Sequence, residues 1–448
     1  MTDHGNEKRQ SLEHLVERIL QEAASQGATD AEVAASEDVG LSVSARARDV
    51  ETVEFNQDRG FGVTVYFGQR KGSASTSDAS DAAIEETIRA ACNVARFTEE
   101  DEFAGLEDAE RMARSVPDLD LYHPETFSAE EAIERAIACE AAALDTDDRI
   151  RRSDGATASA HTVLRAYGNS RGFVGSQIGT RWGLSCMVIG QEGDGGMQRD
   201  YWYTNSRWLD RLEDPEAVGR RAAERTLARL NPRKAPTGSF PVLFVPETAG
   251  GLLSSLLGAL SGGSLYRKAS FLLDSLGETV MPDRYSVTET PHEPGAMGSS
   301  AFDGDGVATR AQAFVAEGVV ASYVLGTYSA RRLGMETTGN GSGVHNVDIV
   351  GPTVPAADLI RDMGTGFMVT EMMGQGVNMV TGDYSRGAAG YWVENGEVAY
   401  PVEEATIASN MADMLKGVAA IGDDRDLRGN VRAPSMLIEG MTVAGVQN

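Results

Sequence analysis

The stretch from residue 363 to residue 402 constrains the fold of this chain more than any other part of the sequence. Eight of these 40 residues are glycine, which is too many for a helix, and their spacing is too irregular for a repeat. Glycine inside a strand typically marks a place where another backbone comes close. The dipeptide Asn395-Gly396 separates residues 390–394 from residues 397–402, and such a dipeptide is typical of a two-residue hairpin. The sequence therefore predicts closely packed antiparallel strands here.

The order helix, strands, helix occurs twice before residue 231. The first unit is predicted to contain a helix over residues 11–27, strands over 31–36, 40–47, 50–55, 60–67 and 72–76, and a helix over 81–97. The predicted turns between these strands include residues 58–60. The second unit is predicted to contain a helix over residues 129–144, strands over 150–159, 163–168, 173–182, 184–192 and 199–204, and a helix over 215–230. Ser128 and Glu131 have the spacing of a capping box at the start of that unit.

The C-terminal part of the chain has a different pattern. After a linker over residues 231–238 come a strand over residues 240–245, one buried helix, and then mostly strands and turns. A chain of 448 residues is too long for one core, so two or three domains are expected. We predict an α+β fold with two helix–antiparallel-sheet–helix units, at residues 1–107 and 123–230. A β-rich, barrel- or sandwich-like C-terminal domain is predicted over residues 237–448.

The excess of acidic over basic residues indicates the kind of organism the protein comes from and the partners it can bind. The formal net charge is -27 and the pI is about 4.6, while the lysines number five. An acidic, lysine-poor surface is typical of proteins adapted to high salt, where screening weakens self-repulsion. Binding to a phosphate backbone needs basic patches, so nucleic acid is not expected as a partner.

The sequence also carries information on the cellular compartment. The N-terminus leads into charged residues without an apolar core, so no secretory signal is expected. The longest uncharged run, residues 248–266, is interrupted by glycines and serines, which argues against a membrane-spanning helix. Three widely spaced cysteines, Cys92, Cys139 and Cys186, are expected to be buried free thiols. We expect a cytoplasmic protein that does not enter a membrane.

Several segments together resemble one known family. They are residues 53–56, 70–75, 262–268, 271–277, 327–334 and the glycine-rich stretch described above. These segments resemble the TldD/PmbA family, which is linked to zinc-dependent peptidase activity and has also been called peptidase U62 or modulator of DNA gyrase. The resemblance is close to the PmbA branch, also called TldE, and covers nearly the whole chain. It implies cleavage of flexible or unfolded polypeptides in the cytosol.

The resemblance also locates the place where zinc would bind. In the TldD branch the corresponding helix carries His-Glu-x-x-x-His, and a cysteine far downstream is a further ligand. In this chain the two histidine positions are Pro246 and Gly251, and no cysteine follows Cys186. Proline and glycine have no side chain that can bind zinc, which usually needs three protein ligands at a catalytic site. We therefore expect no metal or cofactor in this chain, and zinc in a partner subunit.

Glu247 lies between those two positions and matches the glutamate of the motif. It is therefore the candidate catalytic residue. In zinc peptidases the equivalent glutamate acts as general base, but without a metal there is no polarised water for it to activate. The alternative is that Glu247 is an acidic residue in the first turn of a helix, stabilised by the helix dipole.

Two further groups are candidates for binding a peptide. His345 and Asn346 lie in a glycine-rich loop, where a hydrogen-bonded structural histidine is the alternative. Asp383, Tyr384, Ser385 and Arg386 lie in the glycine-rich stretch, where an extended peptide could add as a strand. The alternative there is that the glycines serve tight packing inside the domain.

Three functional interpretations follow. The first is a PmbA/TldE-type subunit that pairs with a zinc-bearing TldD-like subunit in a peptidase assembly and is inactive alone. The second is an autonomous peptidase with a site built from His345, Glu247 or Asp383. The third is a non-catalytic, homodimeric protein that binds extended peptides.

Overall fold

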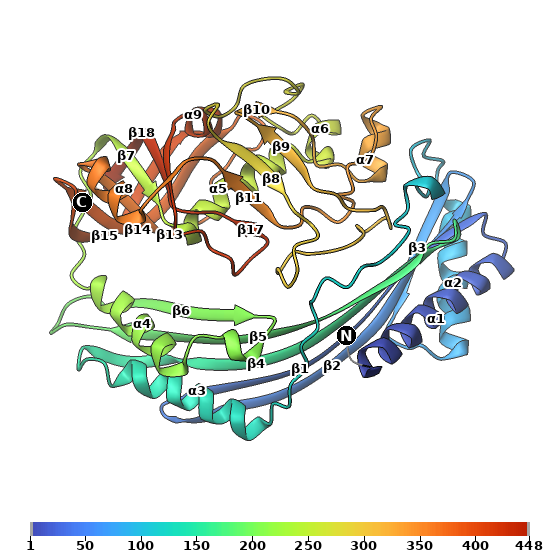
Figure 1. The fold of residues 1–448 in the computed structure, drawn as a ribbon, viewed down its shortest axis with the longest axis horizontal. Helices are drawn as coiled ribbons and strands as arrows, with labels where there is room; N and C mark the ends of the chain where they lie inside the picture. Colours follow the sequence, from blue (N-terminus) through green and yellow to red (C-terminus); the bar gives the residue numbers. More distant parts are fainter. Residues whose placement is uncertain (1–2, 446–448) are drawn as a thin grey trace.

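A single curved antiparallel sheet forms the N-terminal half of the protein (Figure 1). The computed structural model describes residues 3–445. The strands lie in the order β3 (Arg70–Thr76), β2 (Asp49–Phe67), β1 (Asp30–Arg46), β4 (Ile150–Asn169), β5 (Val174–Gly190) and β6 (Gln198–Ser206). The two predicted units therefore share one sheet, which is continuous because β1 pairs with β4 from Glu32 to Ala45.

Four helices cover the convex face of this sheet (Figure 1). Helices α1 (Asp3–Ser25) and α2 (Asp81–Phe97) lie at one end, and α3 (Ala129–Leu144) and α4 (Pro215–Ala228) at the other. Each pair covers its own apolar cluster, because alternate residues of the strands point toward the helices. Ser128 and Glu131 form the predicted capping box of α3.

The N-terminal strands are longer than the sequence pattern predicts. The predicted turn at residues 58–60 is wrong, because these residues pair with β1 in the middle of β2. The predicted breaks at residues 160–162 and at residue 183 also lie inside β4 and β5. Asp58 and Arg59 are exposed on a sheet edge, where polar side chains are compatible with a strand as well as with a turn.

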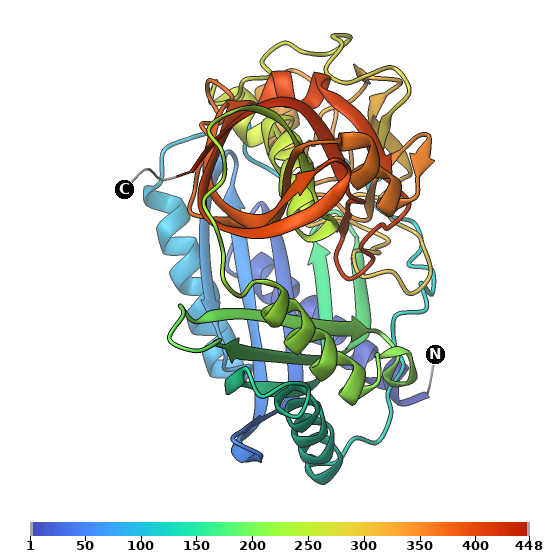
Figure 2. The same cartoon turned by 90° about the vertical axis from the view of Figure 1, so that its left-hand side faces the viewer.

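The C-terminal domain is built around a closed five-stranded barrel, seen nearly end-on in Figure 2. Its strands are β7 (Gly238–Phe244), β13 (Gly366–Met373), β14 (Asp383–Glu394), β15 (Glu397–Asn410) and β18 (Met436–Gly445). Pairing of β18 with β7 closes the barrel. Strands β16 (Val418–Gly422) and β12 (Thr353–Val354) extend this sheet beyond β18. The predicted β-rich domain is therefore a barrel.

A second, smaller sheet packs with the barrel in one continuous core. It contains, in order, β10 (Val319–Val320), β9 (Gln312–Ala316), β8 (Ser286–Glu289), β11 (Val347–Val350) and β17 (Val431–Arg432). Helix α5 (Pro246–Ala259) contributes its leucines to this core. The remaining helices of the domain are short, namely α6 (Gly262–Tyr266), α7 (Thr327–Arg332), α8 (Ala356–Met363) and α9 (Met411–Lys416).

The glycine-rich stretch forms strands as predicted. Asn395 and Gly396 have φ angles of 54° and 79°, and they connect β14 to β15 as a two-residue hairpin with Glu394 opposite Glu397. A Cβ atom at Gly390 would lie 1.9 Å from the carbonyl oxygen of Met368. The glycine at this position is therefore required by the close approach of β13.

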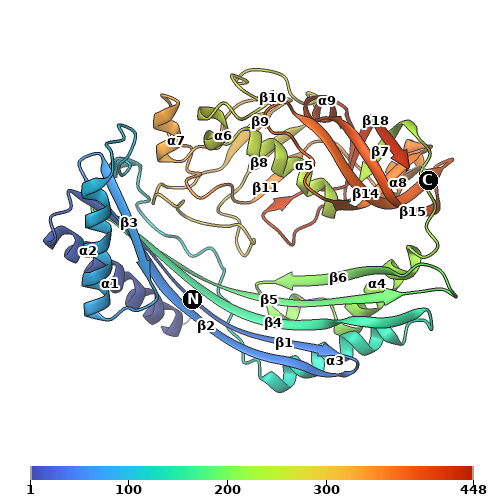
Figure 3. The same cartoon turned by 180° about the vertical axis from the view of Figure 1, so that it is seen from behind.

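The C-terminal domain lies over the concave face of the N-terminal sheet (Figures 1 and 3). The connector over residues 98–124 runs between the C-terminal domain and the N-terminal sheet and forms hydrogen bonds to both. Ala113 donates its N–H to the carbonyl of Gly306 at 3.0 Å, and Thr180 donates to the carbonyl of Leu121 at 2.9 Å. Among the described residues, no helix is long and apolar enough to cross a membrane.

Candidate functional site

Helix α5 begins where the two halves of the protein meet. Strand β7 leads into Val245, and Pro246 occupies the first turn of α5, where its fixed φ suits a helix start. Glu247 follows in the same turn. The first turn of α5 lies beside a cavity of about 420 Å³. This cavity is lined by residues of β5, β6 and α4 from the N-terminal half, and by residues of α5, β13 and β14 from the C-terminal domain.

The cavity is lined mainly by charged side chains. Its basic residues are Arg199, Arg225, Arg229 and Arg386, and its acidic residues are Asp200, Glu247 and Glu371. A second cavity of about 720 Å³ is also lined by Glu247, together with Arg428 and Trp202. Arg225, Glu247 and Thr370 line both cavities, so the two cavities adjoin at these residues.

The carboxylate of Glu247 is paired with two guanidinium groups. Its Oε1 lies 3.4 Å from Nη1 of Arg225 and 3.6 Å from Nη2 of Arg428. The Glu247 side chain is 20% exposed, so these pairs are screened less than surface pairs. The structure thus holds this carboxylate in ion pairs, and both the catalytic and the dipole-stabilised role of Glu247 stay predictions.

The arginines around Glu247 have other acidic partners as well. Arg225 also pairs with Asp200 at 3.3 Å, and Arg229 lies between Asp200 and Glu371. Burial favours a lower pKa for Arg229, but the carboxylates of Glu371 and Asp200 outweigh it and raise the pKa. The result is a network of alternating charges that connects α4, β6, β13 and α5.

An aromatic side chain supports the basic residues on the side of the larger cavity. The guanidinium carbons of Arg221 and Arg428 lie 3.6 and 4.4 Å from the ring centroid of Trp202. Arg428 is further fixed by Asp426 at 2.9 Å, and this pair raises the Arg428 pKa against the effect of burial. Arg428 is thus held in place beside Glu247 by stacking and by a second carboxylate.

The residues at the start of α5 do not fit a zinc ion. Pro246 and Gly251 offer no side-chain donor atom, and the carboxylate of Glu247 is paired with arginines. Across residues 3–445, no group of three or more His, Cys, Asp or Glu side chains is arranged to hold a metal ion. The three cysteines are free and buried, as the sequence predicts.

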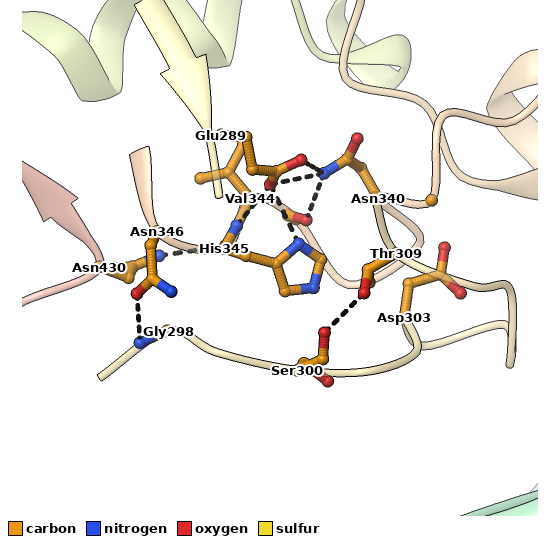
Figure 4. Close-up of polar contacts among 12 residues, drawn as sticks. Glu289, Gly298, Ser300, Asp303, Thr309, Asn340, Val344, His345, Asn346 and Asn430 are labelled. Carbon is orange, nitrogen blue, oxygen red and sulfur yellow. Dashed lines mark hydrogen bonds and ion pairs between the residues drawn. The ribbon is translucent and has the colours of Figure 1, made fainter. Parts of the chain in front are cut away.

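His345 lies in a buried polar cluster on the second sheet (Figure 4). Its Nδ1 lies 3.0 Å from Oε1 of Glu289, and its backbone N–H donates to the same oxygen at 2.6 Å. Asn340 donates to both oxygens of Glu289, and Gln312 donates to Oε2. Burial favours a higher pKa for Glu289, but the bonds from His345 and Gln312 lower it below its ordinary value.

Asn346, the neighbour of His345, is also enclosed. It donates to the carbonyl of Thr290 at 3.0 Å and to Oγ of Ser299 at 2.7 Å, and it accepts from the N–H of Gly298 (Figure 4). His345 and Asn346 are 5% and 0% exposed. Contact with a peptide would therefore require this loop to open, and peptide binding by these two residues stays a prediction.

The strand over residues 383–386 has neighbours on both of its edges. Asp383 to Arg386 pair with β15 on one side. On the other side, Ser385 donates to the carbonyl of Gly376, and Asn378 donates to the carbonyl of Asp383. A Cβ atom at Gly376 would meet the Ser385 carbonyl at 2.0 Å. Both edges of this segment are therefore occupied in the structure. Peptide binding by residues 383–386 stays a prediction.

The side chains of this segment have separate roles. Tyr384 is buried, and burial raises its pKa. Ser385 is exposed, and Asp383 bonds to the hydroxyl of Thr381. Arg386 is half-buried beside the smaller cavity and donates to the carbonyl of Gly374. Arg386 is thus the member of this group that shares a cavity with Glu247.

The sequence did not single out the partners of Glu247. Arg221, Arg225 and Arg229 are spaced four residues apart, which places them on one face of α4 and was a usable signal. Their acidic partners come from β6, α5 and β13, and no local pattern connects these elements. Arg428 lies about 180 residues from Glu247, so its role could be found only from the structure.

Comparison with known proteins covers nearly the whole chain. Family models match in three parts: PmbA/TldA metallopeptidase domain 1 at residues 31–95, the central domain at residues 122–230 and the C-terminal domain at residues 237–445. The metalloprotease PmbA of Escherichia coli O157:H7 is 46% identical over 438 residues, which cover 98% of this chain and 97% of that protein.

Solved structures show the same fold. A proposed modulator of DNA gyrase from Bacteroides thetaiotaomicron superposes with a TM-score of 0.92 at 28% identity, covering 99% of this chain and 100% of the other. TldE from Thermococcus kodakarensis superposes with a TM-score of 0.84 at 20% identity, covering 96% and 100%.

Proposed function

The chain belongs to the PmbA/TldA metallopeptidase family, and we propose that it is the TldE-type subunit of a TldD–TldE peptidase assembly. In this proposal a TldD-like partner carries zinc and performs the cleavage, while this chain lacks the zinc-binding motif and is inactive alone. The substrates are flexible or extended polypeptides. The net charge of -27 supports a cytoplasm with high salt as the setting.

The observation that carries this proposal is the chemistry at the start of α5. A zinc peptidase needs at least three ligands on the metal and a glutamate that is free to take a proton from bound water. Here Pro246 and Gly251 stand at the two histidine positions, and the carboxylate of Glu247 is held by Arg225 and Arg428. Arginine side chains thus occupy the surroundings in which a metal would have to bind.

The concave face of the N-terminal sheet supports a role in holding peptides. Where β1 pairs with β4, the residues that point away from the helices include Ser36, Gly40 and Ser42. Arg165 of β4 and Arg181 of β5 are exposed, and each lies opposite a residue of this face, so they share it. Small polar residues with a few arginines suit a surface that contacts an extended chain without selecting its sequence.

A metal and activity assay tests the proposal. The isolated chain is expected to contain much less than one zinc per molecule and to leave casein and unstructured peptides intact. Together with a zinc-bearing family partner it is expected to form a complex that cleaves them, and a chelator is expected to stop the cleavage. Stoichiometric zinc with chelator-sensitive cleavage by the isolated chain would contradict the proposal.

The same assays distinguish the proposal from two alternative functions. An autonomous peptidase would cleave without a partner and would lose activity when Glu247, His345 or Asp383 is replaced by alanine. The geometry does not favour it, because His345 is buried against Glu289 and Glu247 is paired with arginines. A homodimeric peptide-binding protein would bind unstructured peptides without cleaving them, even after a zinc-bearing partner is added.

A further inference from the structure

The cavity of about 420 Å³ beside the first turn of α5 has a surplus of basic groups. Its walls hold four arginines against three carboxylates, which gives the cavity a formal charge of +1. The chain as a whole has a formal net charge of -27. A surplus cation in a partly enclosed site attracts anions, because the protein walls screen its charge less than water does.

The surplus lies on two of the four arginines. Arg225 and Arg229 are paired with the carboxylates of the cavity. Within residues 3–445, neither Arg199 nor Arg386 forms an ion pair. Arg199 is exposed on β6, at the sheet edge nearest the C-terminal domain (Figure 1). Arg386 lies on β14 and donates from Nη2 to the carbonyl of Gly374 at 2.7 Å. The two free cations therefore reach the cavity from different halves of the protein.

The wall of the cavity also contains two polar atoms without a hydrogen-bond partner. They are Oγ1 of Thr370 and Nε of Arg386, and both are enclosed. Buried polar atoms are nearly always bonded, so an exception calls for an explanation. Both atoms can donate a hydrogen bond. A ligand can reach them only after a side-chain rotation, and it would then supply the missing acceptor.

The chemistry of these donors suits a carboxylate. A carboxylate carries a single negative charge, which matches the surplus of the cavity, and its two oxygens fit the planar fork of an arginine side chain. A phosphate group carries up to two negative charges and would reverse the surplus. Met187 and Met372 form an apolar part of the wall, and methionine adapts to neighbours of different shape.

We infer that this cavity binds a carboxylate of a peptide, held by Arg199 and Arg386 and by the hydroxyl of Thr370 once that side chain has rotated. The carboxylate comes from the C-terminus of the peptide or from an aspartate or glutamate side chain, and the experiment distinguishes these sources. Met187 and Met372 contact the adjoining residue of the peptide. The inference rests on the proposed function, which makes flexible polypeptides the ligands of this chain, and it adds a preference for anionic ones.

Gly251 leaves room for such a ligand. It lines the cavity, and a Cβ atom at this position would meet nothing within 4 Å beyond the adjoining turns of α5. A larger side chain can therefore enter the cavity without a clash at its first atom. Gly251→Leu fills the site while leaving all of its charges in place.

Calorimetric titration of the isolated chain tests the inference. One pair of probes is N-acetyl-Ala-Leu-Ala with a free C-terminal carboxylate and the same peptide as its amide. The second pair is the amides of N-acetyl-Ala-Glu-Ala and N-acetyl-Ala-Gln-Ala, which differ in a side-chain carboxylate. In at least one pair the charged peptide is expected to bind at least tenfold more tightly than its neutral counterpart. That pair identifies the source of the carboxylate.

Substitutions locate the binding site. Arg199→Gln is expected to weaken binding of the charged peptide at least tenfold with an unchanged thermal midpoint, because Arg199 is exposed and forms no ion pair. Arg59→Gln is the matched control, since Arg59 is also exposed on an edge strand, and it should change the affinity less than twofold. Thr370→Val should weaken binding at least threefold without lowering the thermal midpoint, and Gly251→Leu at least tenfold.

Three results would overturn the inference. They are equal affinities within both peptide pairs, equal losses in Arg199→Gln and Arg59→Gln, and binding that Gly251→Leu leaves intact. These measurements use the isolated chain without zinc, so they do not depend on cleavage. Failure of the proposed function would show separately, as absence of cleavage after a zinc-bearing partner is added.

Discussion

Glu247 in the first turn of α5 forms an ion pair with Arg225 in the last turn of α4, with 3.4 Å between Oε1 and Nη1. These helices belong to different halves of the protein, so the pair joins the C-terminal domain to the N-terminal sheet. Arg428 approaches the same oxygen from the C-terminal domain. The position that resembles a catalytic glutamate therefore serves an interdomain contact.

Replacing Glu247 by glutamine should affect stability more than activity. The change removes one charge from two ion pairs that are partly screened, so a loss of about 1 kcal/mol in the free energy of unfolding is expected. Cleavage by the assembly with a zinc-bearing partner should stay within about twofold, measured as kcat/KM on an unstructured peptide. A loss of a hundredfold or more would show that Glu247 acts in the chemistry.

Glu289 should be among the most sensitive positions of the C-terminal domain. Glu289→Ala leaves the donors of His345, Asn340 and Gln312 without their acceptor in a site that is 1% exposed. Removing one member of a buried charged network typically costs about 3–5 kcal/mol. Denaturant unfolding measures this, with Glu99→Ala on the surface as control, where a loss of at most about 0.5 kcal/mol is expected. Equal effects at the two positions would contradict the assigned role of the cluster.

Asp303 should make stability depend on pH in the acidic range. Burial and the nearby charge of Asp305 raise the pKa of Asp303 to about 6. The folded protein then holds this proton more tightly than the unfolded chain does, so stability falls as the pH rises from about 4 to about 6. The full effect is about 3 kcal/mol.

Removing the neighbouring charge should reduce that dependence. Asp305→Asn should lower the Asp303 pKa and flatten the curve of unfolding free energy against pH between pH 4 and 6. Asp194→Asn, which changes an exposed turn, should leave the curve unchanged. A wild-type curve that rises over this interval, with no difference in Asp305→Asn, would refute the assignment.

Two glycines should respond to alanine in opposite directions. At Gly390 the added Cβ would lie 1.9 Å from the backbone oxygen of Met368, and a strand pair would have to separate. A loss of about 3 kcal/mol is expected. Gly251 has open space around its Cβ position inside α5, so Gly251→Ala should stabilise the protein by about 0.5–1 kcal/mol. Thermal midpoints measure both changes, and a shift of equal sign would be inconsistent with this packing.

The sequence predicted those features that local chemistry determines. The capping box of α3 and the Asn395-Gly396 hairpin are formed by residues close in sequence, and both are confirmed. The pairing of β1 with β4 joins segments more than 100 residues apart, and no local signal distinguishes one shared sheet from two. Long strands were divided at polar residues such as Asp58, because a solvated edge and a turn have the same composition.

For the candidate site, too, local features could be predicted from the sequence and long-range contacts could not. The prediction that Pro246 and Gly251 stand in place of metal ligands rests on a resemblance between linear segments, so it could be made from the sequence. The burial of His345 against Glu289 could not, because it depends on a contact across 56 positions. The ion pairs of Glu247 join three separate segments and likewise appear only in the structure.

Zinc content and cleavage, measured on one preparation of the isolated chain and on its mixture with a zinc-bearing family partner, test the central claim most directly. We expect much less than one zinc per chain and no cleavage from the isolated protein, with chelator-sensitive cleavage after mixing. One zinc per chain together with cleavage by the isolated protein would contradict the claim.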